Sequence, residues 1–391
     1  MSSNPVVKDP LFTASKNSLG NGICAQFEYM KIYDHVKSRM IRGQYGIDTL
    51  LPPEKDLANQ FGVSRPTVAR AMSLLKDEGL IRRQAGSGTY VIKVPKETSW
   101  HVGLLIPRLG ETEIFEPICR KIAAFSYQED IQFQWTAGPA YITDKRELAL
   151  QLCRICIDQD LDGVFFTPVE HVESGEELNR GILDQLTSAG IQTVLLDRDI
   201  VPWPCQTSCD LVGIDNIQAG FVVARHLLEQ GCRKIAFATR PQPAMTVQLR
   251  IMGCREALLQ VGLEPSDLFV HEVGVTEPQQ AIKIILRDNP DGLVCANDAT
   301  AAILLRSLVD AGVTIPKDLQ VAAFDDVRYA SLLSVPLTTY RQPCSDIGLT
   351  AVQTMRARLL HPERPAHRIF LKGELVIRES SSRLSSVTPD K

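Results

Sequence analysis

The chain has 391 residues, of which 44% are hydrophobic and 23% are charged, a composition that excludes a disordered protein and allows two or three folded domains. The net charge of −4 is unevenly divided: residues 1–95 hold 13 basic and 8 acidic side chains, and the remainder holds 29 and 38. No apolar run is long enough to cross a bilayer, and the N-terminus lacks the basic start and apolar core of a secretory signal. We therefore expect a cytoplasmic protein, without membrane contact, whose basic N-terminal part meets nucleic acid.

The N-terminal part predicts a small helical domain. Residues 1–26 are polar and lack periodicity, so we expect a flexible extension there. A helix is expected over residues 27–42, where apolar side chains recur at helical spacing. A second, short helix should end at Gly62, and a third should begin with Ser64 as its N-cap. With the hairpin that follows, these helices predict one domain over residues 27–93.

Basic side chains mark the third helix and the hairpin behind it. The polar residues in the first two turns of that helix are Arg65, Thr67 and Arg70. A recognition helix meets base edges and phosphates with these turns. Arg82 and Arg83 then precede Gly86-Ser87-Gly88, a tight turn between two β-prone runs. The pattern predicts a basic wing, and the simpler alternative is a helical hairpin with solvated arginines.

This stretch resembles the winged-helix DNA-binding domain of the GntR family. The matching segments are Leu51-Pro52, Glu54-Lys55-Asp56-Leu57-Ala58, Phe61-Gly62-Val63-Ser64-Arg65, Thr67-Val68, Gly79-Leu80-Ile81 and Gly86-Ser87-Gly88-Thr89-Tyr90-Val91. The resemblance implies a DNA-contacting set made of Lys55, Ser64, Arg65, Thr67, Arg70, Arg82, Arg83 and Gly86. In that set, Arg65 and Thr67 would contact the major groove. Lys55 and Arg70 would contact phosphates, and the wing would approach the minor groove. Ala69 replaces the basic residue that many members carry, so operator preference is expected to differ.

The pattern changes after a short polar linker over residues 94–100. From residue 101 to about residue 380, apolar runs of strand length alternate with helical stretches, which is typical of parallel sheets covered by helices. The alternation starts afresh at residue 234, which predicts two α/β lobes of similar size with a cleft between them. Residues 381–391 are expected to form a flexible tail.

Polar side chains gather where these predicted strands end. They are Asp197, Arg198, Asn297, Asp325 and Gln342, together with Arg250 early in the helix after residues 234–239. In open α/β sheets, ligands bind beyond the carboxyl ends of the strands, so these groups are expected to meet in the cleft. Carboxylates accept from hydroxyls and guanidinium groups donate, which suits a neutral polyhydroxylated ligand. Phe115, after the first strand, is expected to give an apolar wall for a sugar ring.

Residues 101–380 resemble the effector domain of the lac-repressor family and the related periplasmic sugar-binding proteins. The matching pieces are VLLDRD (194–199), VGIDN (212–216), QLRIMGCREAL (248–258), LVCAND (293–298), VAAFDD (321–326) and LTTYRQP (337–343). The resemblance implies a two-lobed, periplasmic-binding-protein-like fold of type I with parallel sheets. It implies a ligand-contacting set made of Asp197, Arg250, Asn297, Asp325 and Gln342. Arg198 matches a position that contacts sugar in ribose-type binders, and the loop around Phe115 departs most from the family. A GntR head on such a body is similar to the arabinose repressors of Bacillus-type bacteria.

Structural roles compete with ligand binding at several positions. An Asp at a strand end often caps the next helix, and we expect capping or hinge roles for Asp215, Asn216 and Asp326. Cys153 and Cys156 form one CxxC, but no second pair or nearby histidines accompany them, so no metal site is expected. The ten cysteines are expected to be reduced packing residues.

These patterns favour a DNA-binding transcriptional regulator, a repressor of carbohydrate genes, controlled by a small sugar-like effector and needing no cofactor. Its expected partners are double-stranded operator DNA, the effector and a second copy of the chain, because a two-fold dimer matches a pseudo-palindromic site. The alternatives are a non-regulatory sugar-binding protein and a regulator that responds to a non-sugar ligand such as a nucleobase. An enzyme, for example a GntR head on an aminotransferase-like body, would need a cofactor lysine at a strand end, and the sequence offers none there.

Overall fold

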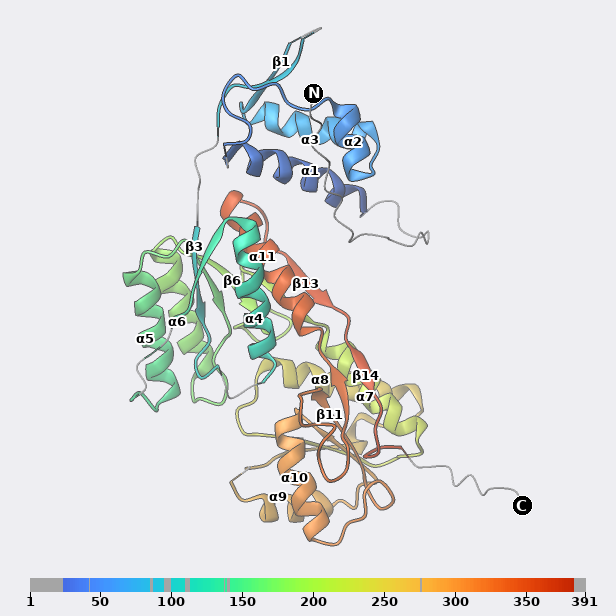
Figure 1. Cartoon of the computed structure of the whole chain (residues 1–391). Helices are drawn as coiled ribbons and strands as arrows, with labels where there is room; N and C mark the ends of the chain where they lie inside the picture. The colour runs from blue at the N-terminus through green and yellow to red at the C-terminus, as the bar shows by residue number, and fades with distance from the viewer. Residues whose placement is uncertain are drawn as a thin grey trace, which may run out of the picture. The chain divides into compact units, whose positions relative to one another are not determined.

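The computed structural model describes residues 24–41, 43–84, 87–94, 100–109, 113–136, 138, 141–274 and 276–382. The chain divides into two compact units, residues 1–98 and 99–391 (Figure 1). The expected N-terminal extension, apart from residues 24–26, lies outside the described residues, as do Gly86 of the wing and most of the expected tail. Within the described ranges, no helix is both long and apolar enough to span a membrane.

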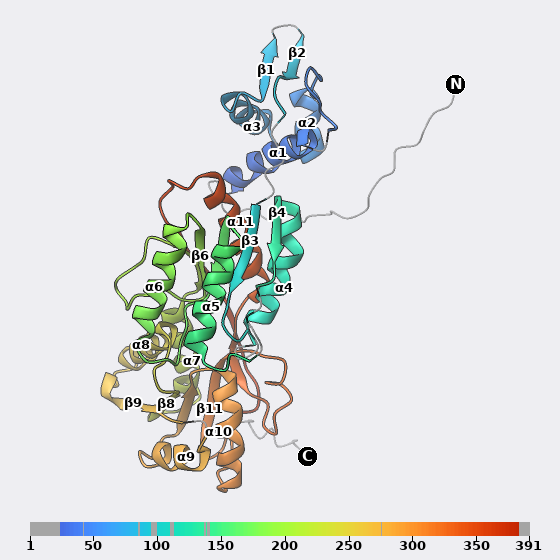
Figure 2. The same ribbon diagram turned by 90° about the vertical axis from the view of Figure 1, so that its left-hand side faces the viewer.

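Within the described residues, the first unit consists of three helices and a two-stranded antiparallel hairpin (Figure 2). The elements are α1 (Cys24–Ile41), α2 (Glu54–Phe61), α3 (Arg65–Asp77), β1 (Ile81–Gln84) and β2 (Gly88–Val91). Their apolar faces close one core, in which Ile32 of α1, Leu57 of α2 and Leu75 of α3 are fully buried. This is the winged helix-turn-helix arrangement that the sequence predicts, and α2 ends at Gly62 as expected.

Two local predictions in this unit need correction. Helix α1 begins at Cys24 rather than at residue 27, and the good helix formers Ala25 and Gln26 allow the additional turn. Ser64 occupies the N-cap position of α3 in extended backbone, but its side chain caps no backbone N–H. The Ser64 hydroxyl instead lies 2.8 Å from the Thr67 hydroxyl, which competes with the backbone for the same oxygen.

The second unit contains two six-stranded sheets, each in its own lobe. Lobe A consists of β3 (Trp100–Leu105), β4 (Ile131–Gln134), β5 (Gly163–Phe166), β6 (Gln192–Leu196), β7 (Asp210–Ile214) and β13 (Arg368–Leu371). The strand order is β13-β7-β6-β5-β3-β4, and every neighbouring pair is parallel. Helices α5 (Lys145–Asp158) and α6 (Gly175–Ser188) cover one face, and α4 (Phe115–Ser126) and α11 (Cys344–Leu360) cover the other (Figure 1).

Lobe B repeats the same strand order with different chain segments. Its strands are β8 (Ile235–Thr239), β9 (Leu268–Glu272), β10 (Gly292–Cys295), β11 (Gln320–Asp325), β12 (Thr338–Arg341) and β14 (Glu374–Val376). The order is β14-β12-β11-β10-β8-β9, in which only β14 is antiparallel to its neighbour. Helices α7 (Asn216–Glu229) and α8 (Met245–Gln260) cover one face, and α9 (Pro278–Leu286) and α10 (Asp298–Asp310) cover the other.

The chain passes between the lobes through three short segments. It crosses between β7 and α7, between β12 and α11, and between β13 and β14. The sequence predicts two lobes, but it does not show that α11 and β13 return to lobe A, because periodicity carries no information on which sheet an element joins. Two expected boundaries also differ: Trp100 of the expected linker opens β3, and Ser381 of the expected tail is fully buried.

A close contact between α7 and α8 fixes the place of Arg250. Gly220 of α7 packs against the backbone of Arg250, and a Cβ atom at Gly220 would lie 2.0 Å from the Arg250 carbonyl oxygen. Only glycine allows the two helices to approach so closely. The contact therefore determines where α8 presents the Arg250 side chain beneath the strand ends of lobe B.

Candidate functional site

The predicted DNA-contacting side chains lie on the surface of the first unit. Thr67 is half-buried, and the exposed members are Lys55, Ser64, Arg65, Arg70, Arg82 and Arg83. Two of the arginines are positioned by neighbouring helices. The Arg70 guanidinium lies 4.3 Å from the centre of the Tyr29 ring on α1, and Arg83 forms an ion pair with Glu54 on α2. These contacts fix the direction of two cations and leave their edges available for phosphate.

The strand-end side chains of the second unit converge between its lobes. Lobe A contributes Glu170, Asp197 and Arg198, and lobe B contributes Arg250, Asp325 and Gln342; we call these six residues the polar centre. All are largely removed from solvent, and the most exposed side chain, that of Glu170, has a relative exposure of 15%. Burying so many charged groups is costly unless each has a partner. The partner of each group therefore shows which groups of the centre are already paired and which are open to a ligand.

In lobe A, Arg198 lies between the carboxylates of Glu170 and Asp197 and contacts both. Its Nη1 atom lies 2.6 Å from Oε2 of Glu170, and its Nε atom lies 3.2 Å from Oδ2 of Asp197. Burial alone would raise the pKa of Glu170, but Arg198, with a smaller contribution from His171, outweighs it and lowers the pKa to about 2. Glu170 is therefore ionised at neutral pH and neutralises Arg198.

Asp197 is the acceptor that lobe A leaves open. It directly follows β6 with a left-handed backbone (φ 69°), and Gly213 allows the neighbouring strand to pass close to it. Burial raises the pKa of Asp197, and the attraction of Arg198 and Arg250 offsets this only in part. Among the described residues, its Oδ1 atom has no hydrogen-bond partner. Such a buried acceptor indicates a position where a ligand can donate.

In lobe B, Arg250 and Gln342 surround Asp325. Gln342 donates from Nε2 to Oδ1 of Asp325 (2.8 Å), and Nη2 of Arg250 lies 4.0 Å from the same oxygen. Arg250 also donates from Nε to Oδ1 of Asn216 (2.9 Å) and from Nη1 to the carbonyl oxygen of Ala296 (2.7 Å). The Oε1 atom of Gln342 has no partner within the described part of the chain. This side thus supplies a second open acceptor.

The two lobes influence each other electrostatically across the centre. Burial raises the pKa of Asp325 to about 6; Arg250 and Gln342 oppose the rise, whereas Asp197 and Glu170 of the other lobe add to it. Carboxylates from two lobes therefore meet in one poorly solvated space. A ligand with several hydroxyl groups can satisfy both, because each hydroxyl donates as well as accepts.

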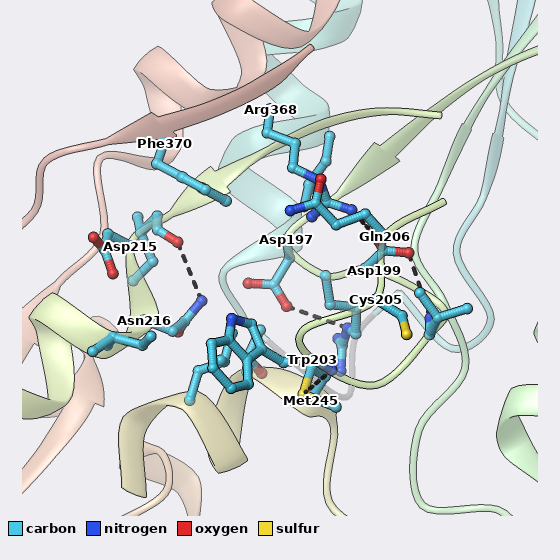
Figure 3. A pocket seen from close by; sticks show the side chains of 17 residues that line it. Asp197, Asp199, Trp203, Cys205, Gln206, Asp215, Asn216, Met245, Arg368 and Phe370 are labelled. Atoms are coloured by element: carbon cyan, nitrogen blue, oxygen red, sulfur yellow. Dashed lines mark hydrogen bonds and ion pairs between the residues drawn. The ribbon is translucent and has the colours of Figure 1, made fainter. Parts of the chain in front are cut away.

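Several cavities border the polar centre. One of about 210 Å³ is lined by Asp197 and Arg198 (Figure 3), and one of about 560 Å³ is lined by Asp325 and Gln342. A third, of about 20 Å³, lies between Phe115 and Arg198, whose guanidinium is 5.8 Å from the centre of the Phe115 ring. Ion pairs and hydrogen bonds join the side chains of the centre to one another, and the cavities open directly beside these side chains.

Comparison with known proteins agrees with this division of the chain. Residues 28–91 match the model of the bacterial regulatory proteins of the gntR family. Residues 224–381 match a periplasmic binding protein-like domain. The chain combines a GntR-type DNA-binding domain with a periplasmic-binding-protein-like domain. The resemblances stated from the sequence motifs are therefore confirmed.

Two relatives align with nearly the whole chain. The arabinose metabolism transcriptional repressor of Geobacillus stearothermophilus is 27% identical over 371 residues, which cover 91% of this chain and 98% of that protein. The protein of the same name from Halalkalibacterium halodurans is 23% identical and covers 92% and 98%. A LacI family transcriptional regulator from Enterococcus faecium, solved with bound ribose, shares the fold with a TM-score of 0.60 at 22% identity, covering 73% and 99%. The chain is a DNA-binding transcriptional regulator rather than an enzyme.

The periplasmic-binding-protein-like domain brings together most of the predicted effector residues, with one exception. Asp197, Arg198, Arg250, Asp325 and Gln342 lie in the polar centre, and Phe115 lies against Arg198. Asn297 instead accepts from the backbone N–H of Thr300 (2.8 Å) and caps α10. Its side-chain oxygen thus serves the helix with one lone pair, and the amide group still has a second lone pair and its N–H donors for other contacts.

Three residues expected to have structural roles do so. Asp215 caps α7 by accepting from the backbone N–H of Gln218 (2.9 Å). Asn216 orients Arg250, as described above. Asp326 forms ion pairs with Arg341 (2.6 Å) and Arg378 (2.7 Å), so it fastens β12 to the last segment of the chain rather than capping a helix.

Two residues that sequence reasoning missed are Glu170 and His171. They lie four and five residues beyond the end of β5, so a search limited to the residues next to the strand ends does not find them. His171 connects the lobes: its backbone N–H donates to the carbonyl of Gln242 (3.1 Å), and its Nδ1 lies 2.9 Å from the carbonyl of Pro241. Extending the search by one loop turn would have included both.

The CxxC pair has a packing role. Cys153 and Cys156 are both fully buried in α5, and burial raises their thiol pKa values to about 11 and about 12. Thiols with such values are protonated at neutral pH and bind metal poorly. Within the part of the chain that the structure describes, no three His, Cys, Asp or Glu side chains gather to hold a metal ion.

Proposed function

We propose that this protein is a cytoplasmic transcriptional repressor of carbohydrate genes whose operator complex is controlled by a sugar-type effector. The effector would bind at the polar centre between lobes A and B. The observation that carries the proposal is the meeting of Asp197 and Asp325, one from each lobe. Both are buried, both have raised pKa values, and guanidinium groups lie beside them.

The chemistry of the polar centre favours a neutral polyhydroxylated ligand. Its formal charges nearly balance, with Glu170, Asp197 and Asp325 against Arg198 and Arg250, so a strongly charged ligand would leave charges unpaired in a buried site. Oδ1 of Asp197 and Oε1 of Gln342 supply acceptors for donated hydroxyls. The arabinose metabolism repressors that align along this chain fit an effector of this class.

DNA binding rests on the basic surface of the GntR domain. We propose that Arg65 and Thr67 enter the major groove, and that Lys55, Arg70 and the wing arginines contact phosphates. Two copies of the domain would bind the two halves of a pseudo-palindromic operator, so the protein would act as a homodimer. Light scattering on the purified full chain should give twice the mass of one chain, and that mass plus one operator duplex when DNA is bound.

Control of DNA binding would come from movement at the three crossover segments. These segments are short, and effector bound at the polar centre contacts both lobes, so it would favour one relative position of the lobes over another. By linkage, effector and operator must change each other's affinity by the same factor. The effector should then weaken or strengthen the operator complex in a titratable way.

The test is a gel-shift titration on an operator selected in vitro from random DNA with the full chain. Pentoses and hexoses, arabinose first, are added over a wide concentration range, and at least one should shift the DNA affinity by five-fold or more. Asp197→Asn and Arg250→Ala should abolish the response while the apo protein keeps its DNA affinity.

The design separates a wrong effector from a wrong site. Nucleobases form a parallel series, and a response to them alone would replace the sugar class by the non-sugar alternative. If Asp197→Asn and Arg250→Ala respond to the sugar as the unchanged protein does, the polar centre is not the effector site. Arg65→Ala is the matched control, because it should lose DNA binding and keep sugar binding in calorimetry.

A further inference from the structure

The cavity of about 210 Å³ beside Asp197 differs in chemistry from the polar centre. We call this cavity the aromatic pocket. Its lining includes Asp197, Trp203, Asn216, Met245, Arg368 and Phe370. In the view of Figure 3, Phe370 and Trp203 lie above and below the Asp197 carboxylate. The polar centre contains charged and amide groups, whereas this pocket combines two aromatic rings and a thioether with one carboxylate.

The aromatic rings are exposed although the fold has no need to expose them. Trp203 is 54% and Phe370 is 50% exposed. Leaving two large apolar side chains in water beside one cavity forgoes the stabilisation that burial would bring, about 25 cal/mol per Å². Large apolar side chains at the edge of a cavity are typical of ligand sites, where a ligand covers them.

The loop that carries Trp203 is held in place without a ligand. Asp199 accepts from the backbone N–H of Ile200 (2.6 Å) and from the hydroxyl of Thr207 (3.0 Å), and it pairs with Arg368 of β13. The loop therefore closes on itself around one carboxylate. The loop that carries Trp203 is therefore ordered before a ligand binds, so little conformational entropy of this loop would be lost on binding.

The pocket also joins the two lobes. Trp203 and Phe370 come from lobe A, whereas Asn216 and Met245 open helices α7 and α8 of lobe B. The backbone N–H of Trp203 donates to Sδ of Met245 (3.5 Å), so the two walls touch. A ring held in this pocket contacts both lobes and therefore senses their relative position.

Asp197 links the aromatic pocket to the polar centre. Its Oδ2 atom faces Arg198 of the centre, and the residue lines the pocket. Oδ1 is the buried oxygen without a hydrogen-bond partner in the described chain. The volume of about 210 Å³ lies below the roughly 300–1,000 Å³ typical of pockets for drug-sized ligands. The pocket thus has space for one ring of a larger effector rather than for the whole effector.

We infer that the effector is a glycoside with a second ring, sugar or aromatic, which packs between Trp203 and Phe370 while the first sugar is bound at the polar centre. Asp197 accepts from a hydroxyl at the junction of the two rings. The weakly polar C–H face of a sugar, like an aromatic ring, packs well on indole and phenyl groups. This inference rests on the proposed function, because it extends the same site, and the experiment below separates the two.

The experiment compares paired ligands by calorimetry on the full chain. Methyl and phenyl glycosides of arabinose, glucose and galactose are titrated, both anomers of each, so that every pair shares its sugar and differs in the second group. For at least one sugar, the phenyl glycoside should bind ten-fold or more tightly than the methyl glycoside. Equal affinities within every pair would overturn the inference and leave the proposed function standing.

Variants assign the gain to the pocket. Trp203→Ala and Phe370→Ala should bring the phenyl-to-methyl ratio close to one, because each weakens the phenyl glycoside far more than the methyl glycoside. Trp135→Ala is the matched control, because Trp135 is equally exposed (56%), follows β4 of the same lobe and does not line the pocket. A ratio that survives in both pocket variants, or that falls equally in the Trp135 variant, would contradict the inference.

The same titrations also test the proposed function separately from the inference about the second ring. Asp197→Asn should weaken both members of each pair, because both use the polar centre. If no glycoside of either series binds and none alters the operator complex, the sugar-effector function fails together with the inference. Binding of free sugars with no gain from a second ring rejects the inference alone.

Discussion

Lobes A and B have the same strand order but complete their ligand-facing ends differently. In that order β6 corresponds to β11, and both strands lead into an aspartate with a left-handed backbone, Asp197 (φ 69°) and Asp325 (φ 114°). Asp325 already accepts from Gln342, whereas Oδ1 of Asp197 has no partner within the described residues. The aspartate of lobe B is thus held by its own lobe, whereas the aspartate of lobe A has one oxygen open to a ligand; the open acceptor of lobe B is the amide oxygen Oε1 of Gln342.

The lobes also differ in how they fasten the last segment of the chain. Strand β7 begins with Asp210, which pairs with Arg358 (2.9 Å) and Arg364 (2.7 Å). The corresponding strand β12 begins with Thr338, whose hydroxyl accepts from Ser381 (2.6 Å) and from the backbone N–H of Arg378 (2.8 Å). Both first residues are fully buried. At the first residue of these strands, one lobe therefore uses a buried charge and the other a neutral hydroxyl group, although Asp326 adds an ion pair with Arg378 in lobe B.

The largest effect that we expect is the loss of stability when the first residue of β7 or of β12 is substituted. Asp210→Asn leaves two arginines without their carboxylate and should destabilise the chain by about 3–5 kcal/mol. Thr338→Val removes only hydroxyl hydrogen bonds and should cost about 1–2 kcal/mol. Urea unfolding of the full chain, followed by circular dichroism, measures both. A loss for Asp210→Asn no greater than that for Thr338→Val would show that the buried charge contributes little.

A smaller difference in stability is expected between substitutions in the loops that follow β5 and β10. Glu170, after β5, neutralises Arg198, and Arg198 holds its pKa near 2; Asn297, after β10, only caps α10. Glu170→Gln should cost about 2–3 kcal/mol at pH 7, and Asn297→Ala should cost about 1 kcal/mol. Urea unfolding at several pH values is the measurement.

The pH dependence gives the control for Glu170. Its folded pKa is lowered, so its contribution is present above the ordinary pKa of about 4.5 and is lost as pH falls toward 2. The difference between Glu170→Gln and the unchanged protein should therefore shrink below about pH 4.5. The difference for Asn297→Ala should not follow this course, since a neutral amide does not titrate. A pH-independent Glu170→Gln difference would speak against the ion pair.

Sequence patterns predict the positions of the strands and of their ends better than they predict the contacts between the lobes. Asp197 and Asp325 could be predicted because each ends an apolar run that must be a strand, and parallel strands end on one edge of a sheet. Gln342 could be predicted because it ends the β-prone run LTTYR. With a search limited to the residues next to the strand ends, Glu170 could not be found, because it lies four residues beyond β5. Trp203 and Phe370 could not either, because they are about 170 residues apart, and β13 joins lobe A only through the crossover topology.

The smallest expected effect concerns the charge of Asp325. Burial raises its pKa to about 6, so its favourable contribution to stability is fully present below the ordinary value of 3.8 and is lost as pH rises through 6. The ionised form is also the better acceptor for a donated hydroxyl. Effector affinity should therefore rise about ten-fold between pH 5 and pH 7, since the ionised fraction of a group with a pKa of 6 rises from about one tenth to about nine tenths.

Asp325→Asn gives the comparison that decides this point. The amide cannot ionise, and Gln342 can rotate its own amide to accept from it, so the hydrogen bond within lobe B persists. In calorimetry with an effector-class sugar, the variant should bind weakly at both pH values, without the ten-fold rise. Its stability should also fall less than that of the unchanged protein between pH 4 and pH 7. An unchanged protein whose effector affinity stays level from pH 5 to pH 7 would place the ligand against Asp197 alone, and lobe B would then act only as a preformed wall.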